Sequence, residues 1–329
     1  MKQRLNWIDV SRGIAFLMVI YSHLEYKNDF LMHFFSPVFL TTFFFVSGYL
    51  YKEGCSFKQV LEQRTRTLLL PLFILGYGLI VLNQIVTFNE AIPLIDRIKG
   101  LLYQNGQNQL LWFIAALYMY SLLFYWVEYW SKTIKKLLVV SLALFVLNVA
   151  YSIWLDGPQI PWHVASAGFG CFYMGLGKAY KQYERKIDAL MLRKILLLCL
   201  AMYITILCFY HESISFGGSK YILDSLLITS LGLLICVYTS KWILNYNRFL
   251  LFVGANTLFY FAFHGKVYSL LQIVIERLFV MGGIEHSFIL DICIGLFITF
   301  LDALILIPFA MFVNKYIPQV LGKGFKLWK

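Results

Sequence analysis

Charged residues are scarce in this chain of 329 residues. Asp, Glu, Lys and Arg together make up 14% of it, whereas 60% is hydrophobic and 18% aromatic. A soluble domain has about 25% charged residues and about 45–50% apolar ones. The composition therefore places the chain outside the soluble class and predicts an all-α integral membrane protein, because helices satisfy their own backbone groups in lipid.

The chain also lacks paired cysteines. Its cysteines include no CxxC pair and have no histidine at a spacing suited to zinc, and all but Cys55 lie in apolar runs, where buried inert thiols are expected. They stand at positions 55, 171, 199, 208, 236 and 293. We therefore expect no structural metal, no bound cofactor and no disulfide framework. A signal-peptide cleavage site is missing too, so the first apolar run is expected to stay as a helix.

Long polar stretches are absent between the apolar runs. A bilayer core needs about 20 apolar residues per helix, and the runs predict about ten membrane-spanning helices, with a bend near His264–Gly265 in the ninth. These spans are 7–24, 31–51, 68–88, 110–130, 137–155, 162–179, 194–210, 221–240, 249–272 and 288–313. The loop 89–109 is expected to hold a short amphipathic helix. Residues 1–329 are expected to form a single transmembrane domain with no soluble domain attached.

Acidic residues are fewer than basic ones, with 17 Asp and Glu against 28 Lys and Arg. With the N-terminus inside, 21 of the basic residues fall on the cytoplasmic side, six fall outside, and Arg12 lies within the first span. This asymmetry follows the positive-inside rule and predicts that both termini are cytoplasmic. It attributes the net charge of +11 to topology and contact with membrane lipid, so no nucleic-acid partner is needed.

Two polar side chains stand out in the first span. Arg12 and His23 are 11 residues apart, which on a helix is about 16 Å along nearly the same face. This spacing suits a long ligand with an anionic head, since Arg binds phosphate as a fork and His acts as a base near neutral pH. The alternative is structural: Asp9 lies one turn below Arg12 and pairs with it, and His23 lies at the membrane interface.

Several longer stretches occur in a characteristic order. They are WIDVSRGIAFLMVIYSH (7–23), FFFVSGYLYKEG (43–54), RTRTLLLPLF (64–73), LLWFIAALY (110–118) and FVGANTLFYFAFHG (252–265). Together they resemble membrane acyltransferase family 3, the integral-membrane sugar and polysaccharide O-acetyltransferases, with the fucose O-acetylase-like branch nearest. The resemblance extends over most of the chain.

The resemblance implies a ten-helix core in a bacterial cytoplasmic (inner) membrane. Acetyl-CoA would serve as co-substrate and a carbohydrate, lipid-linked or polymeric, as acceptor. The family signature of an Arg and a His with ten residues between them falls on Arg12, which would bind the donor CoA, and on His23, the catalytic base. A second donor-binding cluster falls on Arg64 and Arg66. Thr65 separates two arginines that are often adjacent in the family, so which of them is functional stays open.

Supporting roles are assigned to residues near these positions, each beside an ordinary alternative. Glu25 is expected either to orient His23 or to be a loop residue. Asn108 and Trp112 form a sugar platform, or Trp112 belongs to an interfacial aromatic belt. His264 contacts the acceptor or stabilises an oxyanion, or is a buried interface histidine. His163 is left as structural or acceptor-side.

The sequence offers no nucleophile of the hydrolase type. Ser47 is not flanked as G-x-S-x-G, and Ser47–Gly48 is expected to let helices pack closely. Direct acetyl transfer to a hydroxyl of a surface polysaccharide or its lipid-linked precursor is therefore favoured. Two alternatives stay open: a transporter or flippase without acyl chemistry, and a succinyltransferase of the same family. The sequence also leaves the oligomeric state open.

Overall fold

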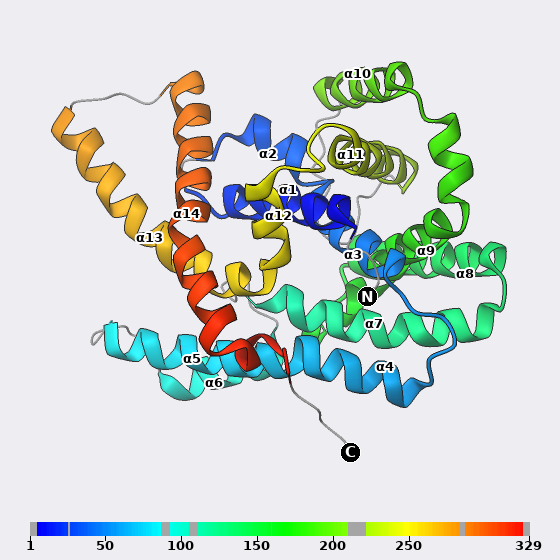
Figure 1. The fold of residues 1–329 in the computed structure, drawn as a ribbon, viewed down its shortest axis with the longest axis horizontal. Coiled ribbons are helices and arrows are strands. Elements are labelled where there is room, and N and C mark those ends of the chain that lie inside the picture. Colours follow the sequence, from blue (N-terminus) through cyan, green and yellow to red (C-terminus); the bar gives the residue numbers. More distant parts are fainter. Residues whose placement is uncertain are drawn as a thin grey trace. The chain divides into compact units, whose positions relative to one another are not determined.

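The computed structural model describes residues 5–25, 27–86, 93–104, 111–158, 160–209, 222–282 and 287–324. Every regular element within these ranges is helical, which confirms the all-α prediction (Figure 1). The chain divides into two compact units. Unit 1 holds residues 1–46 and 180–310, and unit 2 holds residues 47–179 and 311–329.

Unit 1 is built around the first helix, α1. This helix packs against α2, α11, α12 and α13 (Figure 1). The helices that contribute to this unit are α1 (Asn6–Ser22), α2 (Asp29–Phe35), the first part of α3 (Phe39–Tyr49), the end of α9 (Ala167–Leu190), α10 (Arg193–Phe209), α11 (Ile222–Trp242), α12 (Arg248–Ala255), α13 (Thr257–Gly282) and most of α14 (Phe288–Tyr316).

The backbones of α1 and α12 touch directly. A Cβ atom added to Gly254 would lie 1.7 Å from the carbonyl oxygen of Asp9, and one added to Gly13 would lie 2.4 Å from that of Leu250. Only glycine allows so close an approach between two helices, as in many membrane helix pairs. The glycine in the stretch FVGAN thus fixes the place where α12 crosses α1, the helix that carries Arg12 and ends just before His23.

The break in the ninth apolar run lies at Asn256, between α12 and α13. This residue leaves the helical conformation, with φ −119° and ψ 18°, and its side-chain amide donates to the Phe252 carbonyl at 2.8 Å. Asparagine competes in this way with the backbone bonds of a helix. Helix α13 then continues unbroken through His264, so the bend expected near His264–Gly265 is wrong.

Unit 2 contains the remaining helices, and α7 packs against α4, α8 and the short helix η3. Its elements are the end of α3, α4 (Phe57–Arg64), the π-helical turn η1 (Thr65–Leu69), α5 (Leu70–Val86), α6 (Leu94–Tyr103), α7 (Trp112–Ser131), α8 (Ile134–Val149), the π-helical turn η2 (Ala150–Trp154), the 3₁₀ helix η3 (Pro161–Ser166), most of α9, the end of α14 and the 3₁₀ helix η4 (Pro318–Leu321). Helix α6 confirms the short helix expected within residues 89–109.

Gly48 plays the packing role expected of Ser47–Gly48. A Cβ atom at Gly48 would lie 1.9 Å from the carbonyl oxygen of Met174 on α9. The end of α3 and helix α9 therefore approach backbone to backbone within unit 2. The expectation that this pair of small residues lets helices pack closely is confirmed.

Six described segments are long and apolar enough to cross a membrane. They are Asp29–Tyr49, Phe57–Asn83, Ile134–Trp154, Ile222–Trp242, Thr257–Phe279 and Phe288–Tyr316. The bent pair Pro161–Leu190 and Arg193–Phe209 makes a seventh if it is counted as one span. These segments support a multi-pass membrane protein, while the ten spans and the cytoplasmic termini stay predictions.

A cation anchors the end of α11 to the end of α9 in unit 1. The Nζ atom of Lys241 lies 2.7 Å from a carboxylate oxygen of Glu184 and 2.9 Å from one of Asp188. It also donates to the hydroxyl of Tyr180 at 2.7 Å and lies 5.1 Å from the ring centre of Trp7, in α1. The Lys241 side chain is only 11% exposed. These partners therefore replace the water that would otherwise stabilise its positive charge.

Replacing Lys241 by methionine is expected to lower the free energy of unfolding by about 1–3 kcal/mol, because two carboxylates then face each other without a cation. Thermal unfolding of the purified protein in detergent measures the change. Lys99→Met is the control, since its pair with Asp96 spans 3.6 Å between side chains that are 62% and 53% exposed. That variant should change stability by less than about 0.5 kcal/mol, and equal losses in both would contradict the prediction.

Candidate active site

His23 lies directly after the last residue of α1. Its Nδ1 atom is 2.9 Å from the carbonyl oxygen of Val19 and 3.1 Å from the hydroxyl of Ser22. A carbonyl oxygen only accepts hydrogen bonds, so Nδ1 carries the ring hydrogen and Nε2 keeps its lone pair. Because the side chain is exposed, Nε2 is presented as a base that a substrate can reach.

His264 lies beside His23, one residue on α13 and the other at the end of α1. Their ring centres are 5.1 Å apart and the rings are at 80°. The Nδ1 atom of His264 is 2.9 Å from the Tyr260 carbonyl oxygen, so Nδ1 again carries the hydrogen. Its Nε2 is buried and has no hydrogen-bond partner among the described residues. An Nε2 atom without a hydrogen accepts hydrogen bonds and cannot donate one to an oxyanion. This favours contact between His264 and a hydroxyl group of the acceptor substrate over oxyanion stabilisation.

Phe16 holds α13 in place beside α1. Its ring centre lies 4.7 Å from that of Phe261, 5.5 Å from that of His264 and 5.7 Å from that of Tyr260, all edge to face. Such aromatic pairs contribute about 0.5–1.5 kcal/mol each beyond their buried area. Phe16 therefore positions His264 relative to His23.

Glu25 makes its described contacts with α13. Its backbone N–H donates to the hydroxyl of Tyr268 at 2.8 Å, and its carboxylate accepts from the side-chain amide of Gln272. The ring of His23 is instead oriented by Val19 and Ser22. These contacts indicate that Glu25 attaches the turn that follows α1 to helix α13.

Arg12 lies on α1, the helix that ends just before His23. Its guanidinium is 3.9 Å from the Asp9 carboxylate, with the Arg12 side chain 29% exposed. The structural pairing considered for Arg12 is therefore present. A pair at this spacing on one helix contributes only a few tenths of a kcal/mol, much less than the cost of about 2.5–3.5 kcal/mol for a charge at the bilayer centre. The ion pair with Asp9 therefore does not by itself offset the cost of placing the Arg12 charge within a membrane.

In unit 2, Arg64 and Arg66 lie where α4 changes into the π-helical turn η1. Arg64 is the last residue of α4 and Arg66 lies inside the turn. Pro71 follows at the start of α5 and has no N–H to donate, which favours a local widening of the helix. Such turns often occur at functional sites. The turn is not among the features predicted from the sequence, although Pro71, five residues after Arg66, is a usable signal.

Trp112 opens α7 and contacts His163, with ring centres 4.6 Å apart. The neighbouring Trp162 and His163 have φ values of 62° and 54°, an uncommon conformation for bulky residues. Hydrogen bonds hold them: Tyr120 donates to the His163 carbonyl at 2.6 Å, and Trp162 donates to the Leu102 carbonyl at 2.7 Å. This strained pair beside Trp112 was not predicted. Asn108 lies outside the described residues.

Comparison with known proteins places these features in a family. The sequence profile of the acyltransferase domain matches residues 5–308. The chain belongs to membrane acyltransferase family 3. No curated protein and no solved structure matches it.

As a member of family 3, the chain is supported as a membrane acyltransferase. The hydrogen bond from Nδ1 of His23 to the Val19 carbonyl leaves the lone pair on Nε2. The profile covers all the described site residues, including Arg12, Arg64 and Arg66. The fucose O-acetylase-like branch stays a prediction.

Proposed function

We propose that this family 3 acyltransferase moves an acetyl group from cytoplasmic acetyl-CoA to a hydroxyl of a surface polysaccharide or of its lipid-linked sugar precursor. The observation that carries the proposal is the hydrogen bond from Nδ1 of His23 to the Val19 carbonyl at 2.9 Å. It leaves Nε2 as the basic atom at the exposed end of α1, within a chain of this family.

The proposed step is a direct transfer. Nε2 of His23 takes the proton of the acceptor hydroxyl as its oxygen attacks the thioester carbon of acetyl-CoA. The new C–O bond forms and the C–S bond breaks, and the proton passes from His23 to the leaving thiolate, which gives CoA. The backbone-bonded Nδ1–H keeps the ring in one tautomer throughout, as the third member does in hydrolytic triads.

The arginines are proposed to bind the donor. Arg12 lies about 16 Å from His23 along α1, and Arg64 and Arg66 lie at the π-helical turn of unit 2. A guanidinium binds phosphate through two parallel hydrogen bonds. Within unit 1 we assign a donor phosphate to Arg12 and the thioester to the end of α1. Within unit 2 we propose Arg64 and Arg66 as phosphate-binding residues on their own account.

Two residues are proposed for contact with the acceptor, His264 in unit 1 and Trp112 in unit 2, each from the contacts inside its own unit. His264 offers a buried acceptor nitrogen next to His23. Trp112, supported by His163, supplies an aromatic face suited to a sugar ring. In the proposed topology of ten spans with cytoplasmic termini in a bacterial inner membrane, His23 faces the external side, where a surface glycan is reached.

The test of this function is transfer of radiolabel from acetyl-CoA to glycan in membranes that contain the protein. Label on the glycan is expected with acetyl-CoA, and only background is expected in membranes that lack the protein. Succinyl-CoA serves as the comparison donor. Label from succinyl-CoA alone would overturn the acetyl assignment, and no label from either donor would contradict the proposed reaction.

The rate of transfer is expected to rise with pH through the range in which the His23 imidazole loses its proton. Only the neutral ring accepts the hydroxyl proton, so the rate is low below this range and levels off above it. The profile is obtained from initial rates measured between about pH 5 and 8 in sealed vesicles that contain acetyl-CoA inside. A rate that stays flat across the range would remove a histidine base from the mechanism.

A further inference from the structure

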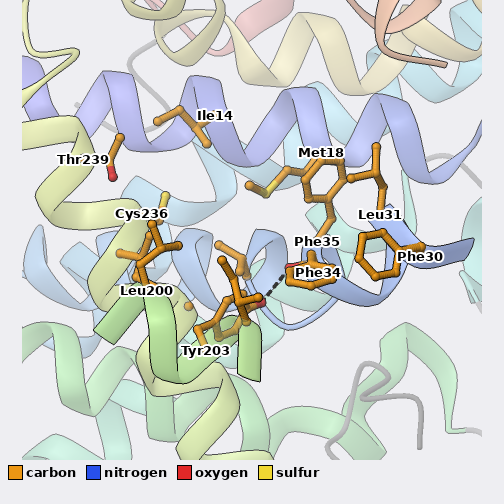
Figure 2. Close-up of a pocket in the computed structure, with 14 residues that line it drawn as sticks. Ile14, Met18, Phe30, Leu31, Phe34, Phe35, Leu200, Tyr203, Cys236 and Thr239 are labelled. Carbon is orange, nitrogen blue, oxygen red and sulfur yellow. Dashed lines mark hydrogen bonds between the residues drawn. The ribbon is translucent and has the colours of Figure 1, made fainter. Parts of the chain in front are cut away.

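A groove of about 460 Å³ lies in unit 1 among α1, α2, α10 and α11. Figure 2 shows Ile14 and Thr239 at one end and Phe30 and Leu31 at the other. Its volume falls within the range of about 300–1,000 Å³ that is usual for ligand sites. The groove is thus large enough for part of a substrate.

The lining of the groove is apolar. No charged side chain is among the described residues that line it. The hydroxyl of Tyr203 already donates to the Phe34 carbonyl at 2.6 Å, as the dashed line in Figure 2 shows. Apart from this group and the hydroxyl of Thr239, the lining is almost wholly apolar, which suits a hydrocarbon chain.

The walls of the groove belong to segments that can cross a membrane. Helix α11 and the segment Asp29–Tyr49, which includes α2, both have the length and hydropathy of a span. Ile204, on the α10 wall, is 42% exposed. A groove between such helices opens towards lipid, so its occupant arrives from the bilayer.

The groove lies on the opposite side of α1 from the site residues. Counted at about 100° per residue from Arg12, His23 lies at about 20° and Phe16 at about 40°, whereas Ile14 and Met18 lie at about 200° and 240°. The contacts agree, because Phe16 meets α13 and Met18 lines the groove. An acyl group on a donor that binds along the Arg12–His23 face does not reach the groove.

One end of the groove adjoins the turn that carries His23. Helix α2 begins at Asp29, and its first turn supplies Phe30 and Leu31 to the lining. Leu31 also packs against the buried cluster of Tyr21, Leu24 and Ile298, and the first two of these flank His23 in the sequence. A chain lying in the groove therefore ends close to the proposed base.

We infer that this groove binds the hydrocarbon tail of a lipid that carries the acceptor sugar, so that the sugar hydroxyl lies over His23. The inference rests on the proposed function and selects the lipid-linked precursor as the acceptor. The tail enters from the bilayer between α2 and α10, while the donor uses the other face of α1. The two substrates thus approach His23 from different sides of one helix.

The first experiment is photolabelling of the full-length protein in phosphatidylglycerol vesicles. The probe is a sugar joined through phosphate to a long polyprenyl tail that bears a diazirine. Labelled peptides from α10 and α11 are expected, and an excess of the same long-tailed lipid without diazirine should remove the label. Equal labelling by a diazirine-bearing phosphatidylglycerol would show a site for bulk lipid, and cross-links between two chains would show a protein interface; each result overturns the inference.

The second experiment fills the groove. Ile204→Trp should raise KM for the long-tailed acceptor roughly tenfold, equivalent to about 1.4 kcal/mol of lost binding, and leave KM for a short-tailed, water-soluble version unchanged. Leu197→Trp is the matched control, since Leu197 is on the same helix, is 65% exposed and does not line the groove. Equal effects on both acceptors, or no effect, would overturn the inference. If the wild type acetylates neither acceptor, the proposed function fails, and photolabelling still decides the groove.

Discussion

His23→Ala is expected to lower acetyl transfer by about 10²–10⁴-fold, the usual loss on removing a general base. The reason is geometric: Nδ1 is bonded to the Val19 carbonyl, so Nε2 is the only ring atom with a lone pair for the hydroxyl proton. The measurement is kcat and KM for acetyl-CoA in vesicles with matched amounts of protein. The loss should fall on kcat, because the proton moves only in the reaction step.

His33→Ala is the matched control for this prediction. His33 lies on α2, in the same unit, and does not take part in the proposed chemistry. Its replacement should leave kcat within about twofold, since it touches neither substrate in the proposed mechanism. Full activity of His23→Ala would exclude the base, and equal losses in both variants would indicate a general effect on the fold.

Gly254→Ala is expected to have the largest effect on stability. The new Cβ atom would lie 1.7 Å from the carbonyl oxygen of Asp9, which is backbone and cannot rotate away as a side chain would. Helix α12 must then move off α1, at a cost of about 3 kcal/mol or more. Thermal unfolding in detergent should show a clearly lowered midpoint, and acetyl transfer should fall with it because the Arg12 end of α1 is displaced.

Gly78→Ala provides a control of opposite sign. Gly78 lies in α5, and a Cβ atom there meets nothing within 4 Å. Alanine in an open helix position is favoured over glycine by about 0.5–1 kcal/mol, so this variant should be as stable as the wild type or more stable. Equal destabilisation of both variants would show that the α1–α12 crossing is not the cause.

Much of the architecture was predictable from hydropathy. Low charge and long apolar runs follow directly from the hydrocarbon solvent, which leaves helices as the spanning form. The close approach at Gly48 was also predictable, because small residues permit helix contact. The break at Asn256 was not: an asparagine within an apolar run reads as part of the span, and only its bond to the Phe252 carbonyl shows that it ends α12.

The candidate site was predictable in part for the same kind of reason. The spacing of Arg12 and His23 depends on the rise and pitch of one helix, so the sequence alone indicates that they share a face. The partnership of His23 with His264 depends on how α13 lies against α1 through Phe16. No spacing along the chain encodes that contact.

The sequence by itself determined the membrane class, the helices and the choice of Arg12 and His23, because these follow from composition and from local periodicity. Only the tertiary structure decided that His264 lies beside His23, which helix Glu25 contacts and where the apolar groove lies. Each of these depends on distances between atoms from separate helices or turns. Such distances are set by packing between helices that are far apart in the sequence. Here that packing consists of close backbone contacts at glycines and edge-to-face contacts between aromatic rings.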